Sequence, residues 1–105
     1  MVLHSNSTEF GTKVLSKKGE TAVLFYDASD PRSVNFLPVF RNQESRSPVN
    51  LAQVNLGGQD PLRTRYNLKN LPCVVIFENG HAKRRKEPAD GASTLSEQDL
   101  RAVLR

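Results

Sequence analysis

The side chains of this sequence that could do chemistry are few and far apart. A single cysteine, Cys73, excludes an intrachain disulfide, a CxxC redox pair and a zinc site built from several thiolates. The two histidines, His4 and His81, have no spacing typical of metal ligands. We therefore expect neither a metal nor another cofactor.

The run Lys83-Arg84-Arg85-Lys86 is the densest charge in a chain of net charge +4. Such a run could contact the phosphates of a nucleic acid or another polyanion. On a strand, however, alternate side chains point to opposite faces, and charge on an edge strand prevents edge-to-edge pairing. No aromatic residue is interleaved, and Glu87 follows directly. We favour a solvated edge strand and keep polyanion binding as an alternative.

Length and hydropathy indicate one domain covering residues 1–105. No apolar run approaches the ~20 residues that span a bilayer, and the first nine residues lack the layout of a signal peptide. If the chain is complete, we expect a cytoplasmic protein without a membrane partner.

Hydrophobic periodicity and turn signals predict nine elements. They are a helix at 8–17, a strand at 21–26, a helix at 31–44 containing Pro38, a strand at 49–56 ended by Gly57-Gly58, a short helix at 60–66, a strand at 73–78, a turn at Asn79-Gly80, a strand at 81–87 and a helix at 93–104. The strand–helix–strand part must be parallel, whereas the Asn-Gly turn makes a hairpin. The fold class is therefore α/β, with a mixed sheet of four to five strands flanked by helices.

Within these elements we expect particular caps and core positions. Ser5 or Ser7 should cap the first helix, and Ser96 the last. The apolar positions of the helical pattern at 31–44 are Val34, Leu37, Val39 and Phe40.

Two strings resemble the thioredoxin-like superfamily, which includes thioredoxins and protein disulfide isomerase domains. They are "LFYDASDPRSVNFLPVF" (residues 24–40) and "RYNLKNLPCVVIFENG" (residues 65–80). The resemblance implies a thioredoxin-like fold with a cis peptide bond before Pro72. It also places Asp30-Pro31-Arg32-Ser33 where the family carries its two-cysteine motif, with Asp30 and Ser33 at the cysteine positions.

These substitutions remove the family's chemistry. A carboxylate cannot exchange with a disulfide, and a serine hydroxyl is hardly ever ionised near neutral pH. The family's buried aspartate and its lysine partner correspond to Leu24 and Gln53, and its tryptophan to Ser29. We therefore expect no dithiol oxidoreductase activity, and we interpret Asp30 as a helix N-cap followed by proline.

The resemblance leaves a groove that could still bind. In the family, the residue before the cis proline pairs through its backbone with an extended peptide, a binding mode that needs no thiol. That residue is Leu71, with Pro72, Cys73 and Asp30-Pro31-Arg32-Ser33 around it, and Arg32 favours an acidic ligand. We expect a redox-inactive domain that binds a protein or peptide in an adaptor, chaperone-like or assembly role.

The alternative is a single-thiol redox or thiol-sensing protein that acts through Cys73. We favour a buried, unreactive Cys73, because free cysteines are often buried and no cation is evident in the sequence to lower its pKa.

Overall fold

The computed structural model describes residues 2–6, 8–16, 18–44, 49–56, 60–88 and 95–104. Its elements, in chain order, are β1 (Leu3–Ser5), a short π-helical segment η1 (Gly11–Leu15), β2 (Glu20–Tyr26), α1 (Pro31–Arg41), β3 (Asn50–Asn55), α2 (Pro61–Arg65), β4 (Cys73–Glu78), β5 (His81–Lys86) and α3 (Glu97–Leu104).

The described strands form one mixed sheet of five strands in the order β1-β3-β2-β4-β5. β3 runs parallel to both β1 and β2, whereas β4 is antiparallel to β2 and to β5. Helix α1 connects the parallel strands β2 and β3, and the turn at Asn79 and Gly80, both with positive φ, connects β4 and β5. The expected α/β class, mixed sheet and hairpin are confirmed.

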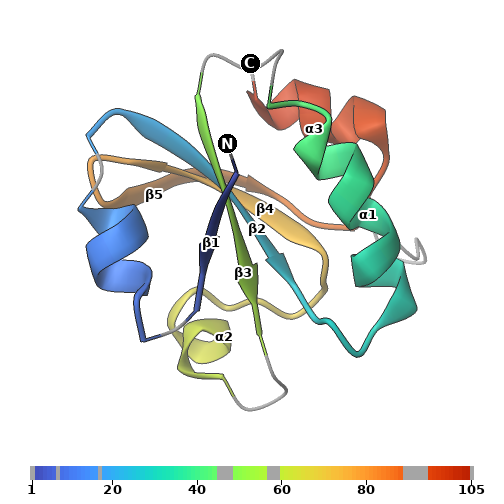
Figure 1. The fold of residues 1–105 in the computed structure, drawn as a ribbon, viewed down its shortest axis with the longest axis horizontal. Helices are drawn as coiled ribbons and strands as arrows, with labels where there is room; N and C mark the ends of the chain where they lie inside the picture. The colour runs from blue at the N-terminus through green and yellow to red at the C-terminus, as the bar shows by residue number, and fades with distance from the viewer. Residues whose placement is uncertain are drawn as a thin grey trace.

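Helical segments cover both faces of the sheet, so the core has two halves (Figure 1). In β2, Val23 and Phe25 point toward the half that packs against η1 and α2. The alternate residues Ala22 and Leu24 belong to the half that packs against α1 and α3. Because β2 is central and buried on both sides, its sequence is a continuous apolar run rather than an alternating one.

Three helices begin where their capping residues predict. The Asp30 and Asp60 carboxylates accept from the backbone N–H groups of Arg32 and Leu62, each at 3.0 Å, and proline takes the first helical position in both helices. In α3, the Ser96 hydroxyl accepts from the Asp99 N–H at 3.1 Å, as expected. The last helix begins at Glu97, and residues 93–94 of its expected span lie outside the described residues.

The N-terminal region differs from the prediction. Ser5 belongs to β1, a three-residue strand too short to give a periodic signal, and Ser7 lies outside the described residues. The side chain that holds the following turn is Asn6, whose Oδ1 accepts from the Glu9 N–H at 2.9 Å. The helix expected at 8–17 shortens to η1.

The buried face of α1 also differs. Phe36 and Phe40 are buried together with Ser33, whereas Val34 is 38% exposed and Leu37 and Val39 are half-buried. Apolar residue type alone therefore does not identify the buried face of α1, since Val34 is among the apolar positions but is exposed. Residues 33, 36 and 40 are spaced by three and four, as one face of a helix requires. The helix continues past Pro38 and ends at Arg41, earlier than expected.

Candidate functional site

The topology brings two distant segments together at one end of the sheet. β2 ends at Tyr26 and α1 begins at Pro31, so residues 27–30 connect them at this end. β4 is antiparallel to β2, and its first residue, Cys73, pairs with Phe25. The loop that precedes β4 therefore lies beside the start of α1.

A cavity of about 210 Å³ lies between these segments. We call it the pocket. Its lining comes from the loop after β2, from α1, from α2, from the loop before β4 and from the residues after β5: Asp27, Asp30, Arg32, Arg63, Lys69, Asn70, Leu71 and Pro88.

Asp30 is held on two sides by Arg32. Besides capping the Arg32 N–H, its carboxylate accepts from Arg32 Nε at 3.2 Å and from Nη2 at 3.1 Å. The hydrogen bonds from the Arg32 side chain contribute most to lowering the pKa of Asp30, and the bond from the Arg32 N–H adds to it, despite some desolvation. The group is therefore a carboxylate at neutral pH. The interpretation of Asp30 as an N-cap is confirmed.

Asp27 is the second carboxylate of the pocket. It accepts from the Ser29 hydroxyl at 2.6 Å and from the Ser29 N–H at 2.9 Å, and its Oδ2 lies 3.8 Å from Arg63 Nη2. The Ser29 hydroxyl is the main cause of the lowered pKa of Asp27, and Arg63 adds to it. Ser29 thus fixes an anion in the pocket.

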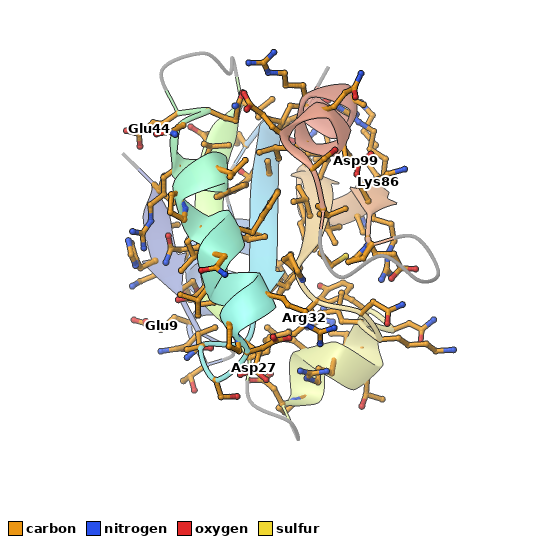
Figure 2. The ribbon with its side chains drawn as sticks, turned by 90° about the vertical axis from the view of Figure 1, so that its right-hand side faces the viewer. Glu9, Asp27, Arg32, Glu44, Lys86 and Asp99 are labelled. Carbon is orange, nitrogen blue, oxygen red and sulfur yellow. The ribbon has the colours of Figure 1, made fainter. Side chains whose placement is uncertain are left out.

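The charges that line the pocket are unequal. Among the described residues of the lining, the cations Arg32, Arg63 and Lys69 face two carboxylates, Asp27 and Asp30, which leaves one excess positive charge in this set. Arg32 and Arg63 have ion pairs inside the pocket, whereas Lys69 has no ion pair with any other described residue. Figure 2 shows Asp27 and Arg32 near one another where α1 begins, with α2 beside them.

Of the residues predicted for the site, the structure brings Asp30, Arg32 and Leu71 into the lining of one pocket. Pro31 is exposed and does not line it. Ser33 is fully buried, and its hydroxyl has no hydrogen-bond partner in the described part of the chain. Pro72 is buried, and the Leu71–Pro72 peptide bond is cis, as the resemblance implied.

Cys73 is fully buried at the start of β4. Burial raises the pKa of its thiol to about 11, although Arg85 Nη2 lies 3.8 Å from the Sγ atom. The expectation that no cation lies nearby was wrong, since Arg85 reaches Cys73 from the adjacent strand. Desolvation nevertheless outweighs this cation, so the group is a neutral thiol near pH 7.

Two residues of the basic run lie over the start of β2. Lys83 Nζ lies 2.9 Å from both Glu20 and Glu78, and this carboxylate pair raises the pKa of Lys83. Arg84 Nε donates to the Val103 carbonyl oxygen of α3 at 2.9 Å, and its Nη2 lies 3.5 Å from Glu20.

The other two residues of the basic run are also engaged. Arg85 donates from Nη1 to the Tyr66 carbonyl at 2.6 Å and from Nη2 to the Asn67 carbonyl at 3.1 Å, which holds the end of α2. Lys86 Nζ lies 4.0 Å from Asp99 on α3, and Figure 2 shows the two labels side by side, away from Asp27 and Arg32. The run is an edge strand of the described sheet, as expected, and each of its four cations has a partner within the described residues, with Glu20 shared by Lys83 and Arg84.

Leu24 and Gln53 are opposite one another on β2 and β3. Both are buried, and Gln53 accepts from Arg41 Nε at 3.0 Å and donates to the Tyr26 hydroxyl at 3.3 Å. Leu24 has an apolar side chain and Gln53 has a neutral amide, so neither residue can transfer a proton near neutral pH.

Sequence reasoning missed five residues of the pocket: Asp27, Arg63, Lys69, Asn70 and Pro88. Asp27 had a usable signal, because it is an acidic residue directly after a buried strand. Arg63 and Lys69 had none, since an arginine in a five-residue helix and a lysine in a loop are ordinary surface residues until the topology places them.

No protein-family model matches this chain. Within the described ranges, no helix is long and apolar enough to cross a membrane. The same residues contain no group of three or more His, Cys, Asp or Glu side chains placed to hold a metal ion.

Proposed function

We propose that the chain is a redox-inactive thioredoxin-like domain that binds an extended segment of a protein or peptide at the pocket, in an adaptor, chaperone-like or assembly role. The observation that carries the proposal is the convergence of Asp30, Arg32 and Leu71, which are 41 positions apart at their extremes (71 − 30), on one cavity.

Binding fits these residues better than catalysis does. A nucleophile must be accessible and must have a base or a lowered pKa to activate it. Ser33 is buried, Cys73 is a buried thiol with a raised pKa, and the Asp30 carboxylate is already bound to Arg32. The two buried groups are not accessible, and both carboxylate oxygens of Asp30 are already occupied by hydrogen bonds from Arg32.

The mode of binding proposed is strand addition beside Leu71. Main-chain hydrogen bonds would supply affinity without sequence preference, and side chains of the ligand would enter the neighbouring cavity. A cavity of about 210 Å³ is smaller than the roughly 300 Å³ at which small-molecule sites begin. It has room for one side chain of a longer ligand, which favours a peptide over a free metabolite.

The test begins with a randomised hexapeptide display library selected on the whole chain, followed by an NMR titration of the 15N-labelled protein with the best synthetic peptide. We expect the amide signals of Arg32, Ser33, Leu71 and Cys73 to shift together with saturation. Shifts confined to β1 and α3 would reject the pocket, and failure to select any peptide would reject the proposed function. An insulin-reduction assay with dithiothreitol should show no acceleration by the protein.

A further inference from the structure

The three cations of the pocket come from separate parts of the chain. Arg32 is on α1, Arg63 is on α2, and Lys69 is in the loop before β4. Ordinary surface charges on neighbouring elements spread apart in water, because nothing compensates for the repulsion of like charges held close together. These three instead line one small cavity with two carboxylates between them.

The start of α1 does not itself provide an anion site. Its free N–H at Arg32 already donates to Asp30 Oδ1, and the same carboxylate fixes the Arg32 guanidinium through two further bonds. Any preference for an anion must therefore come from the side chains. The two carboxylates of the lining pair with Arg32 and Arg63. Lys69 has no ion pair with another described residue.

The charge balance indicates which anion would fit. One excess positive charge is neutralised by one singly charged carboxylate. A phosphate near neutral pH carries ~1.5–2 negative charges, and Asp27 and Asp30 in the same cavity would repel the second one. The small volume of the cavity also admits a side-chain carboxylate more easily than a bulkier phosphorylated side chain.

We propose that the pocket selects a glutamate or aspartate side chain of the bound peptide, with Lys69 and the outer edge of Arg32 as the groups that recognise it. This inference rests on the proposed peptide binding. Leu71 lines the same cavity, so a segment paired beside it has a side chain within reach of Lys69. Asn70, also in the lining, adds an amide that can donate to a carboxylate.

The test compares three forms of the peptide selected by display, with glutamate, glutamine or phosphoserine at the position that the selection enriches. We expect the glutamate form to bind about tenfold more tightly than the glutamine form, the effect of one charge-assisted contact. The variant Lys69→Met should lose most of this preference. Its matched control is Lys18→Met, which removes the same charge next to the opposite end of β2.

Each outcome bears on one claim. Selected peptides without an enriched acidic position, or equal binding of the glutamate and glutamine forms, would overturn the carboxylate inference and leave peptide binding intact. A phosphoserine form that binds more tightly than the glutamate form would also overturn it, in favour of a phosphate site. An equal loss in Lys69→Met and Lys18→Met would assign the preference to net charge and not to the pocket. If no peptide binds at all, both proposals fail.

Discussion

The protein has two cation-rich regions, and they differ in what their charges contact. In the basic run, four consecutive cations diverge: Lys83 reaches two carboxylates, Arg84 and Arg85 reach backbone carbonyls, and Lys86 reaches α3. In the pocket, cations that are distant in sequence converge on one cavity. Charge density along the chain is highest in the first region, whereas Lys69, which has no ion pair with another described residue, lies in the second.

The difference follows from the geometry of a strand. Successive side chains of β5 point to opposite faces, so a run of four cations divides between the α2 side and the α3 side. Arg85 then reaches the end of α2, Arg84 and Lys86 reach α3, and Lys83 pairs with Glu20 and Glu78 of the sheet itself. Three of the four cations of the basic run therefore connect helical segments to β5, whereas Lys69 of the pocket has no ion pair with another described residue. Four predictions test this contrast.

The largest effect should be a pH dependence of the free energy of unfolding that comes from Cys73, whose Sγ atom lies 3.8 Å from Arg85 Nη2. Its pKa is about 11 in the folded protein against an ordinary value of 9.0. The unfolded chain loses this proton first, so the contribution to stability is complete below pH 9 and is lost as the pH rises to about 11. Between these values the wild type should lose about 2 kcal/mol more than Cys73→Ala.

Urea unfolding of both proteins at pH 8, 9, 10 and 11 measures this difference. Taking the difference between the two proteins cancels the contributions of the titratable groups that they share. Parallel pH profiles would contradict the assignment of Cys73 as a desolvated thiol. The same result would show that Arg85 stabilises the thiolate about as strongly as burial destabilises it.

The second effect separates the two regions by stability. Arg85→Met removes two charge-assisted hydrogen bonds to the carbonyls of Tyr66 and Asn67 and should lower the free energy of unfolding by about 2 kcal/mol. Lys69→Met removes a charge that has no ion pair with another described residue and should change the free energy of unfolding by less than about 0.5 kcal/mol. Chemical denaturation measures both. Equal losses of stability in the two variants would mean that Lys69 contributes to folding as Arg85 does, and would contradict the difference between the pocket and the basic run.

The third effect is on affinity. Asp30→Asn keeps an N-cap residue, since asparagine caps as well as aspartate, but removes one of the two carboxylates of the pocket. The glutamate peptide should bind about threefold more tightly, with a melting temperature unchanged within about 2 °C. Asp60→Asn is the matched control, because Asp60 caps α2 in the same way and does not line the pocket. Weaker binding of Asp30→Asn than of this control would mean that Asp30 accepts hydrogen bonds from the peptide.

The smallest effect is expected at Lys83. Its two ion pairs are exposed, so Lys83→Met should lower the melting temperature by only about 1–2 °C, and 1 M NaCl should abolish the difference. Peptide affinity should not change. A drop in affinity comparable to that of Lys69→Met would place the basic run in the binding surface after all.

The elements were largely predictable, because local signals determine them. Asp-Pro pairs begin α1 and α2, and Asn79-Gly80 makes the turn between β4 and β5. The apolar run "CVVIFE" has the same bounds as β4, Cys73–Glu78. β1 was missed because three residues carry no periodicity, and it is held by pairing with β3, a contact about 50 residues away. The local sequence around β1 does not indicate that β3 is its pairing partner.

The site was predictable only in part, for the same reason. Asp30, Arg32 and Leu71 were found through a resemblance that brought two distant strings together. Arg63 and Lys69 belong to the pocket because β4 is antiparallel to β2, which is a property of the assembled sheet. Val34 shows that residue type can also mislead. Valine is usually buried, but position 34 lies on the exposed side of α1.

The two halves of the core have a consequence for spectroscopy. The chain has two tyrosines and no tryptophan, and each tyrosine packs against a different half of the core. Tyr66 lies among Phe10, Phe25 and Phe77, with ring centroids 5.3–6.3 Å away, whereas Tyr26 lies on the α1 side and accepts from Gln53. Tyrosine emission of Tyr26→Phe and Tyr66→Phe would therefore report the melting of each face of the sheet separately, without an added label.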